Sequence, residues 1–579
     1  MNHLNESHQV IHARPSPSTR HELVGSLRKI VGRRQVKCGD ASTAYYRMGF
    51  RSGRGGAAAV VFPGTLVQQW RVLQVCIAHA CVIIMQAAKT GLTEGSCPSG
   101  DDYDRPVVII NVTRIKGIVP ILGGTQVIAL PGATLHELEQ VLAPLGRVPH
   151  SVIGSTSIGA TIIGGVANNA GGALCKRGSS YTELACFARV KKDGVLELVD
   201  QLGLRDVGDT PEAILSCLDA GRLSPSMVEP SDKAASDRDY EQRIRDVEAS
   251  VPNRYNADPR RLCDVSGSAG KVAAFAVRLD TYPAPKRKAV FYVGTNTPSN
   301  LVDLRRRMLT QMRHLPDMCE VMDRGVFDVA ARFGKDVFLS IKHLGTQRLP
   351  RAYALKAKAE YWMNKLPWLP KYLPDIALYH ASRLFRQHLP PRLLRYRDRF
   401  EYHLIVVCSD EGIEETRQLL DQHWMPLSDT EYFLCDQVEQ EAALLHRFAA
   451  AGAAIRYQNL HQRTTEDVLA LDVALLGSDD RWSESLPKEI TDQLEISLRY
   501  GHFLCHVFHY DYIFKRGTDI DAVKKQLLAQ FSERGAKYPA EHNVGHLYDA
   551  DETLRSHYES LDPTNTFNPG IGGMSKLGK

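Results

Sequence analysis

The sequence predicts an α+β fold in three parts, two of them globular and the third strongly basic. Short runs rich in valine and isoleucine, each followed by turn residues, alternate with stretches of helical periodicity. With 579 residues, 44% of them hydrophobic and 24% charged, the chain can bury several cores. Its positive charge is concentrated in one segment. These observations favour separate globular parts with a cationic insert.

The first part is predicted to run from the N-terminus to about residue 280. Residues 1–21 are expected to form a flexible tail, and an amphipathic helix is predicted to follow at 21–30. Four strands and two helices are predicted next. The strands are 57–62, 82–86, 107–111 and 126–130, and the helices are 65–79 and 134–142. The polar stretch 199–260 is expected to be a surface insertion.

The second part is predicted to resume the alternation of strands and helices. Its strands are expected at 289–294 and 402–408, with helices that begin near Ser299 and at 519–535. No run of about 18 apolar residues and no targeting segment is visible, so any membrane contact is expected to be made from the surface. Twelve scattered cysteines without a CxxC pair indicate a reducing compartment.

Two glycine-rich stretches are the candidates for a ligand site. The first, residues 86–96, follows an apolar strand and reads QAAKTGLTEGS; the second, 150–172, offers hydroxyls, amides and bare backbone with hardly any charge. Small residues let the backbone approach a ligand, and successive N–H groups bind phosphate. One such stretch could simply turn the chain, but two long ones favour a large planar cofactor that carries phosphates. Neither matches the GxGxxG or P-loop pattern.

Histidines and a carboxylate gather near the C-terminus, namely His502, His509, Glu541 and His542. On a strand, residues seven apart point to opposite faces, and on a helix they stack two turns apart. His502 and His509 therefore converge only if a bend lies between them. A neutral histidine is a natural acceptor for a proton near neutral pH. Each of these residues could instead be a hydrogen-bonded structural residue, and the spacing alone leaves both interpretations open.

The basic segment lies between residues 346 and 400. Its twelve Lys or Arg and three acids give this segment a net charge of +9. Because the whole chain has a net charge of +5, the remainder of the chain carries −4. Large aromatic residues alternate with the cations, as around Lys365, Trp368 and Lys371, and this mixture is typical of surfaces that meet anionic lipid. A solvated surface or a nucleic-acid or protein partner is the alternative. The predicted membrane-binding residues are Arg383, Arg386, Arg392 and Arg395.

A further stripe of apolar residues at helical spacing lies at 441–457. Such a stripe belongs either to the core or to the same membrane surface.

The motifs together resemble the FAD-binding vanillyl-alcohol oxidase superfamily, of the PCMH type. That resemblance rests on TGLTEG at 90–95, IGG at 163–165 and NAGG at 169–172. Within it, the sequence is most similar to the respiratory, quinone-dependent D-lactate dehydrogenases, over nearly the whole chain. The segments that carry this second likeness are 51–53, 86–96, 149–159, 254–259, 446–457, 538–548 and 562–570.

The resemblance implies three domains and a bound FAD. An FAD-binding domain at 22–280 would be completed by 531–579. A cap domain with a mixed sheet would comprise 281–325, 400–437 and 462–530, and basic membrane-binding segments would comprise 326–399 and 438–461. The implied FAD contacts are Ala87, Ala88, Lys89, Thr90, Gly91, Gly95, Ser96, Gly154, Thr161, Gly171 and, through its backbone, Ala274. The first loop has no histidine for a covalent link, so the FAD is expected to be non-covalent.

The resemblance also implies the chemistry. Oxidation of a 2-hydroxy acid removes a hydride from C2 and a proton from the hydroxyl, and His542 occupies the position of the base. In metal-dependent relatives, residues matching His502, His509 and Glu541 bind a divalent ion. Here the usual Gly-Asp-Gly-Asn between the histidines is replaced by 503–508, and Asn543 replaces a glycine, so the metal requirement stays open.

The expected partners are D-lactate or a similar D-2-hydroxy acid, a membrane quinone and an anionic lipid surface, and no nucleic acid is expected. The expected location is peripheral, at the cytoplasmic face of the inner (plasma) membrane. A soluble dehydrogenase of another D-2-hydroxy acid and a non-catalytic membrane-binding protein with a flavin fold are the alternatives. The arginine for the substrate carboxylate is not identified; Lys515 and Arg516 are near the histidines in sequence only.

Overall fold

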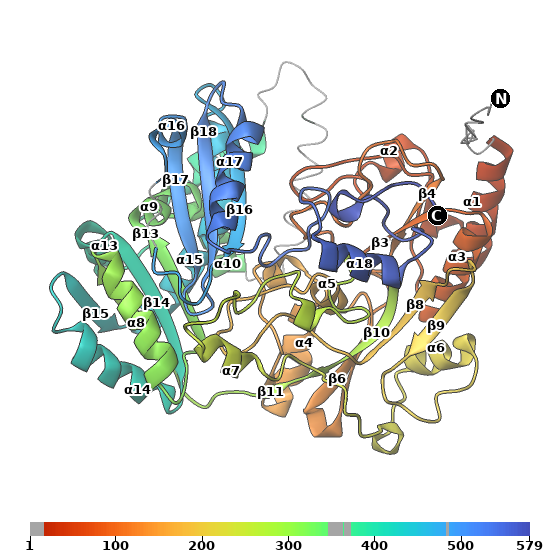
Figure 1. Ribbon diagram of the computed structural model, residues 1–579, viewed down its shortest axis with the longest axis horizontal. Coiled ribbons are helices and arrows are strands. Elements are labelled where there is room, and N and C mark those ends of the chain that lie inside the picture. Colours follow the sequence, from red (N-terminus) through yellow and green to blue (C-terminus); the bar gives the residue numbers. More distant parts are fainter. Residues whose placement is uncertain (1–16, 345–362, 364–371, 482–485) are drawn as a thin grey trace, which may run out of the picture.

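The computed structural model describes residues 17–344, 363, 372–481 and 486–579 (Figure 1). Two bodies lie side by side in this view. The N-terminal half forms the body on the right, with a four-stranded sheet, a five-stranded sheet and a two-stranded pair of β7 (Arg147–Val148) and β11 (Tyr282–Pro283). The second half forms the body on the left around one large sheet. The C-terminus returns to the first body, where the Gly578 amide donates to Asp104 at 2.8 Å.

A four-stranded sheet of order β1-β2-β4-β3 begins the first body. Its strands are β1 (Val36–Lys37), β2 (Ala59–Val61), β4 (Val107–Asn111) and β3 (Val82–Gln86). The last three pair in parallel, whereas β1 pairs antiparallel to β2. Helices α1 (Pro17–Val31) and α3 (Leu66–Ala78) pack on the sheet through their leucines and valines. Thr65 caps α3 by accepting a bond from the Gln68 amide.

The second sheet of this body is antiparallel, of order β5-β6-β10-β8-β9. Its strands are β5 (Ile118–Ile121), β6 (Gln126–Ala129), β10 (Ala273–Asp280), β8 (Ala185–Val190) and β9 (Leu196–Asp200). The accompanying helices are α4 (Leu135–Leu142), α5 (Ile162–Ala167), α6 (Pro211–Ala220) and α7 (Tyr240–Arg245). A capping box of Thr134 and Glu137 begins α4.

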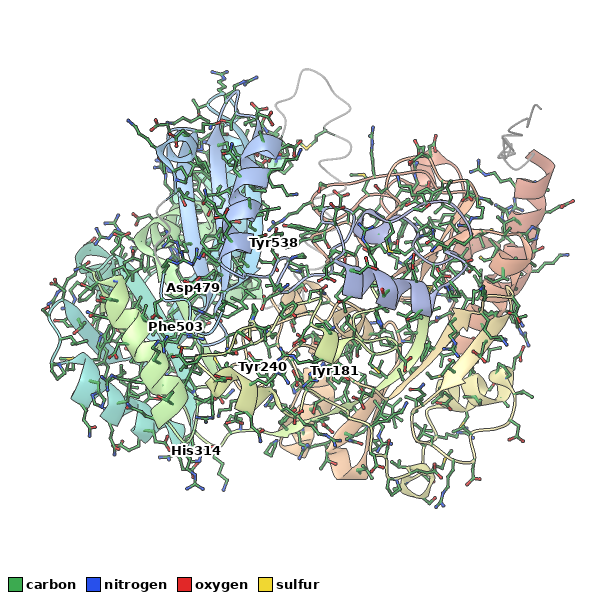
Figure 2. The ribbon with its side chains drawn as sticks, viewed as in Figure 1. Tyr181, Tyr240, His314, Asp479, Phe503 and Tyr538 are labelled. Atoms are coloured by element: carbon green, nitrogen blue, oxygen red, sulfur yellow. The ribbon has the colours of Figure 1, made fainter. Side chains whose placement is uncertain are left out.

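The expectation that 199–260 forms a surface insertion is wrong in part. Leu215 and Leu218 of α6 are buried in the first body's core. Tyr240 of α7 is fully buried in a core of the second body and lies between the bodies in Figure 2. The polar composition of this stretch did not predict these buried residues, because each helix buries only a few apolar side chains.

The C-terminal segment completes the first sheet. Helix α18 (Glu552–Leu561) precedes a stretch in which Phe567 bridges Ile83 of β3 in parallel. The Ile83 amide donates to Thr566 and the Ile83 carbonyl accepts from Asn568, each at 2.9 Å. Residues nearly 500 positions apart in sequence therefore pair at one edge of the four-stranded sheet of the first body.

The second body is built on a seven-stranded sheet of order β15-β12-β14-β13-β17-β18-β16. Its strands are β12 (Lys288–Thr295), β13 (Met318–Asp323), β14 (Tyr402–Ser409), β15 (Thr430–Leu434), β16 (Thr465–Ala474), β17 (Leu494–His502) and β18 (Val507–Lys515). Every pairing in it is antiparallel, so the expected mixed pairing of the cap sheet is wrong. The sheet with both parallel and antiparallel pairs is the four-stranded sheet of the first body.

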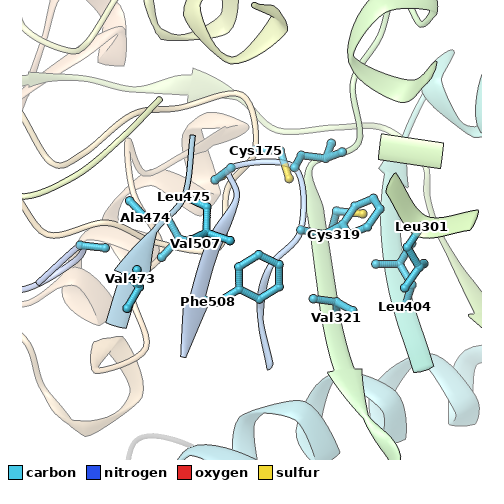
Figure 3. Close-up of a cluster of buried hydrophobic side chains, with 14 of the residues drawn as sticks. Cys175, Leu301, Cys319, Val321, Leu404, Val473, Ala474, Leu475, Val507 and Phe508 are labelled. Atoms are coloured by element: carbon cyan, nitrogen blue, oxygen red, sulfur yellow. The ribbon is translucent and has the colours of Figure 1, made fainter. Parts of the chain in front are cut away.

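Helices cover both faces of the large sheet. On one face lie α8 (Pro298–Gln311), α14 (Gly412–Leu419) and α17 (Ile520–Glu533). On the other lie α9 (Arg324–Phe333), α10 (Lys335–Leu344), α13 (Pro391–Arg399) and α15 (Gln437–Leu460). Figure 3 shows the core beneath the first group, where Cys175, from the first body, enters beside β13.

Helix α15 contains the apolar stripe predicted at 441–457. Its buried positions are mostly small and lie in the core against α9. They include Ala442, Ala443, His446, Ala449, Ala450, Ala453 and Ala454. The stripe residues themselves are less buried: Leu444, Leu445, Phe448 and Ile455 are half-buried and Ala451 is exposed. The stripe therefore lies at the margin of this core, and a membrane contact of 438–461 stays a prediction. Within the described ranges, no helix combines the length and apolar character needed to cross a bilayer.

Candidate active site

The hairpin of β17 and β18 brings the two histidines together. His502 pairs with Val507, and Tyr500 pairs with His509. Since Val507 and His509 are two residues apart on one strand, His502 and His509 lie on the same sheet face. Their ring centroids are 5.4 Å apart. The bend that the spacing left open is the turn at 503–506, in which His506 adopts a left-handed φ of 59°.

Glu541 joins the pair from the C-terminal segment. Its Oε2 lies 3.1 Å from Nε2 of His502 and 3.7 Å from Nε2 of His509. Its amide donates to Asp472 of β16 at 2.7 Å, which fixes the loop against the sheet. One potential ligand atom from each of the three side chains lies within 4.8 Å of the others.

Three residues that the sequence did not single out support this cluster. Glu320 of β13 lies 2.6 Å from Nδ1 of His502, and Arg447 of α15 lies 2.8 Å from the other oxygen of Glu320. Arg254 donates to Glu541 at 2.6 Å, with only 2% of its side chain exposed. Both buried carboxylates are therefore paired with an arginine.

The two histidines of the cluster have pKa values shifted in opposite directions. Burial alone would lower the pKa of His502, but the carboxylates of Glu320 and Glu541 raise it to about 10. Burial instead keeps the pKa of His509 well below its usual value, although Glu541 opposes this effect. Burial acts to raise the pKa of Glu541, but His502, Arg254 and His509 hold it well below normal. Without a metal, His502 is thus a cation and His509 is neutral.

His542 lies next to this group and is half-buried. Burial raises the pKa of the Asp472 carboxyl, and the nearby His542 opposes that rise, so the two side chains interact. His542 therefore stands at the edge of the cluster, beside a carboxylate.

Both glycine-rich stretches reach the cluster. A Cβ on Gly171 would lie 2.4 Å from Oε1 of Glu541, so only glycine fits there. Asn543 accepts a bond from Thr93 Oγ1 at 3.2 Å and donates to Asn168, which joins the first stretch to the second. The two candidate cofactor loops and the His–Glu cluster thus form one site.

The loops fit a nucleotide cofactor in shape. A Cβ on Gly91 or Gly154 would meet no atom within 4 Å, so open space lies beside both loops. Residues 87–92 are half-buried, and four of them, Ala87, Ala88, Thr90 and Gly91, have small side chains or none. A planar group could lie against such a wall with its phosphates near the backbone.

Several of the predicted cofactor residues have other partners in the structure. The Lys89 side chain turns away and donates to the carbonyls of Tyr45 and Met48, so only its backbone faces the loop. Thr161 caps α5, and the carbonyl of Ala274 accepts from Gln69. The other predicted cofactor residues, Ala87, Ala88, Thr90, Gly95 and Ser96, lie along the first loop.

Lys515 and Arg516 are excluded as partners of the cluster. Both are exposed at the far end of β18, where Arg516 donates to the carbonyl of Gln462 at 3.0 Å.

The predicted membrane arginines divide into two groups. Arg383, Arg386 and Arg395 are exposed. Arg392 forms a two-point ion pair with Glu439 and lies over the Phe433 ring, so it has a structural role instead. Lys365, Trp368 and Lys371 lie outside the described residues.

Exposed apolar side chains accompany these cations. Leu384 is 88% exposed and Phe385 is 58% exposed, directly between Arg383 and Arg386. This group of four residues, 383–386, is called the exposed tip below.

Comparisons with known proteins agree with this geometry. A family model described as an FAD binding domain matches residues 57–196, and one described as D-lactate dehydrogenase, membrane binding, matches 290–579. The chain is 50% identical to the quinone-dependent D-lactate dehydrogenase of Escherichia coli, over 96% of this chain and 97% of that protein. The Haemophilus influenzae protein of the same name is 48% identical, over 96% of this chain and 98% of that protein.

Solved structures of low identity show the fold. A 4-ethylphenol oxidase from Gulosibacter chungangensis matches with a TM-score of 0.57 at 12% identity, over 97% of this chain and 99% of that one. A p-cresol methylhydroxylase also gives 0.57 at 12% identity, over 97% of this chain and 98% of that one. The FAD fold of the vanillyl-alcohol oxidase type, predicted from the two glycine-rich stretches, is thereby confirmed. Because 50% and 48% of the aligned residues are identical to these two relatives over 96% of the chain, the chain belongs to the family of quinone-dependent D-lactate dehydrogenases.

Proposed function

We propose that this chain oxidises D-lactate to pyruvate at its FAD and passes the electrons to a membrane quinone. The observation that carries the proposal is that the second glycine-rich loop meets the His–Glu cluster at Gly171 and Glu541, while the first loop, through Thr93, bonds Asn543, which directly follows His542. When bound, FAD accepts the hydride from C2 of the hydroxy acid.

His542 is the proposed base for the hydroxyl proton. Histidine is the side chain best suited to take a proton near neutral pH. His542 is half-buried at the edge of the cluster and interacts with Asp472, which is buried. A proton accepted there would be stabilised by that neighbouring carboxylate.

His502, His509 and Glu541 are the proposed ligands of a divalent metal. Glu320 holds Nδ1 of His502 and leaves Nε2 directed at Glu541, as outer carboxylates do for metal-bound histidines. Two imidazoles and one carboxylate suit zinc or manganese, and such an ion would polarise the substrate hydroxyl. The residues that differ from the metal-dependent pattern, 503–508 and Asn543, do not remove any of the three ligands.

Metal analysis tests this assignment. Elemental analysis of the purified protein should find about one divalent ion per chain, and exhaustive chelation should abolish turnover until the ion is restored. Full activity in metal-free protein would show that the reaction needs no ion at this site, and that His502, Arg254 and Arg447 balance the two carboxylates.

A peripheral place on an anionic membrane, at the cytoplasmic face, is also proposed. The exposed tip places Leu384 and Phe385 between two arginines, a mixture that enters the headgroup region.

A substrate panel tests the proposed reaction. Initial rates with D- and L-lactate, D-2-hydroxybutyrate and D-2-hydroxyglutarate, with a short-chain quinone as acceptor, should give the highest kcat/KM for D-lactate. A clear preference for the dicarboxylic acid would instead indicate a dehydrogenase of another D-2-hydroxy acid.

A further inference from the structure

Three histidines lie together in the core of the second body, on the α15 side of the large sheet. His403 comes from β14, His446 from α15, and His388 from the segment between α12 (Leu373–Arg383) and α13. Phe327 lies against two of them, with ring centroids 4.4 Å from His446 and 5.3 Å from His403. His388 is 4.6 Å from Phe338 and 6.5 Å from His446. We call His388, His403 and His446 the histidine trio.

The polar atoms of the trio are unsatisfied. All six ring nitrogens are buried without a hydrogen-bond partner among the described residues. The carbonyls of Phe400 and Phe327 are the nearby polar groups for His403 and His446, but neither meets hydrogen-bond geometry. Leaving a buried donor or acceptor unpaired costs about 1–3 kcal/mol each, so three such rings in one core are a costly arrangement.

Burial also keeps the trio neutral. It lowers the pKa of His403 and of His446 to about 3, and that of His388 to about 4. Each neutral ring therefore presents one N–H donor and one acceptor. An apolar wall with a few N–H donors is the environment that a quinone ring and its carbonyls require.

The trio stands in one row with the active site. His403 pairs with Met322, Met322 with Tyr500, and Tyr500 with His509, so all four side chains share one sheet face. Three strand spacings separate His403 from His509, or roughly 15 Å.

Helix α15 contacts both the trio and the residues that support the His–Glu cluster. Arg447, the residue after His446, pairs with Glu320 and lies 4.6 Å over the Tyr500 ring. The trio and the His–Glu cluster are therefore adjacent compartments beneath one helix.

His388 connects the trio to the exposed tip along the chain. His388 follows Leu384 and Phe385 by only a few residues in the same short segment, 384–390. Lys335 holds that segment through a bond to the carbonyl of Phe385 at 2.7 Å. A ligand that enters from the lipid side at the tip would reach His388 first.

We propose that the histidine trio binds the head group of the quinone acceptor, with an imidazole N–H donating to a quinone carbonyl. This site rests on the proposed function, because it supplies the acceptor for electrons from D-lactate. D-lactate yields pyruvate, two electrons and two protons, and the quinone takes two electrons and two protons to become the hydroquinone. Since Phe338 and Leu389 fill the same core, the segment 384–390 must move outward to admit the ring.

Separate acceptors distinguish this site from the catalytic site. His446→Leu and His388→Leu should leave D-lactate turnover with a water-soluble acceptor such as ferricyanide within about twofold of wild type. Turnover with a short-chain ubiquinone should show a KM raised about tenfold, the equivalent of one lost hydrogen bond. His423→Leu, a half-buried histidine outside the trio, is the matched control and should change neither rate.

Unchanged quinone kinetics in both variants would overturn the assignment. Photolabelling of the wild-type holoenzyme with an azido-quinone gives a second measurement that needs no variant. Label on peptides from 384–403 or 437–460 supports the site, and label confined to other peptides contradicts it. If wild-type protein fails to oxidise D-lactate with either acceptor, the proposed function fails instead, and the labelling still locates the quinone.

Discussion

His542 is the histidine proposed as the base, because it stands at the half-buried edge of the cluster beside Asp472 and is not one of the three proposed metal ligands. Replacing it with alanine should lower D-lactate turnover by about 10²- to 10⁴-fold, the usual contribution of a positioned base. The FAD should stay bound, since His542 lies outside both glycine-rich loops. Steady-state rates and flavin absorbance measure the two effects.

His136→Ala is the matched control for this variant. His136 lies on the surface helix α4, remote from the cluster, and its loss should leave the rate unchanged. Wild-type turnover by His542→Ala would remove that residue from the reaction.

The two fully buried members of the histidine trio should make the protein sensitive to acid. The pKa of His403 and of His446 is about 3 in the folded state, below the value of about 6.5 in an unfolded chain. The unfolded state therefore binds more protons below pH 6.5, and the stability held above that pH is lost as pH falls toward 3. Between pH 7 and 5 each histidine should cost about 2 kcal/mol of unfolding free energy.

Denaturant unfolding at several pH values measures this loss. In the double variant His403→Leu/His446→Leu, the decline between pH 7 and 5 should be smaller by about 4 kcal/mol. Parallel pH profiles for the variant and the wild type would mean that these histidines are already paired or hydrated.

Single residues also show where the sequence could be interpreted and where it could not. The four members of the cluster were identifiable from their motif. Glu320, Arg447 and Arg254 were not, because each reaches the site from a segment far away in sequence. Arg254 and Arg447 lie in segments that carry the family likeness, 254–259 and 446–457, but nothing in those segments connects them to Glu541 or Glu320. Only the fold shows that Arg254, in a polar stretch, is buried against Glu541.

At the scale of elements, the contact between the second glycine-rich loop and Glu541 allows a sharp test. Gly171→Ala would place a Cβ 2.4 Å from Oε1 of Glu541 and so displace that carboxylate. Turnover should fall at least about tenfold while the protein remains folded, because a small displacement of a positioned group is enough to slow chemistry. Rates and the thermal midpoint should be measured together.

Gly452→Ala is the control for a glycine substitution. Gly452 is exposed on α15, and a Cβ added there would meet no atom within 4 Å. Alanine at this position should therefore stabilise the helix by about 1 kcal/mol and leave turnover unchanged. Wild-type turnover by Gly171→Ala would show that Glu541 is free to move without loss.

The elements themselves were largely predictable. The strand expected at 82–86 is β3, and the helix expected at 65–79 is α3 with Thr65 as its cap, since local periodicity and capping fix both. The hairpin between His502 and His509 was not predictable from spacing. Its turn at 503–506 reads FLCH and contains no glycine, proline, asparagine, aspartate or serine, so it carries no usual turn signal.

For the whole molecule, the exposed tip should control the affinity for membranes. Charge reversal in Arg383→Glu/Arg386→Glu should weaken binding to vesicles of mixed anionic and neutral lipid by at least about tenfold, because each cation contributes about 1 kcal/mol. Vesicle flotation at low and moderate salt measures this effect. The ferricyanide rate should be unaffected, since the tip is remote from the His–Glu cluster in the fold.

Arg205→Glu/Arg222→Glu is the control pair, on the first body. It changes the net charge equally but should retain vesicle binding. Equal loss in both pairs would mean that overall charge, and not the tip, holds the protein at the surface.

The assembly of the two bodies could not be inferred from the sequence. Cys175 enters the core of the second body, Phe567 returns to the first sheet, and Tyr240 lies between them. These contacts join distant segments, and each one depends on the fold being already in place.

Anaerobic mixing of the purified protein with D-lactate tests the proposed reaction most directly, with absorbance followed near 450 nm. Loss of the flavin band with D-lactate, little loss with L-lactate, and recovery of the band on addition of a quinone are the expected results. A flavin band that dithionite bleaches but D-lactate leaves unchanged would contradict the assignment of this chain as a D-lactate dehydrogenase.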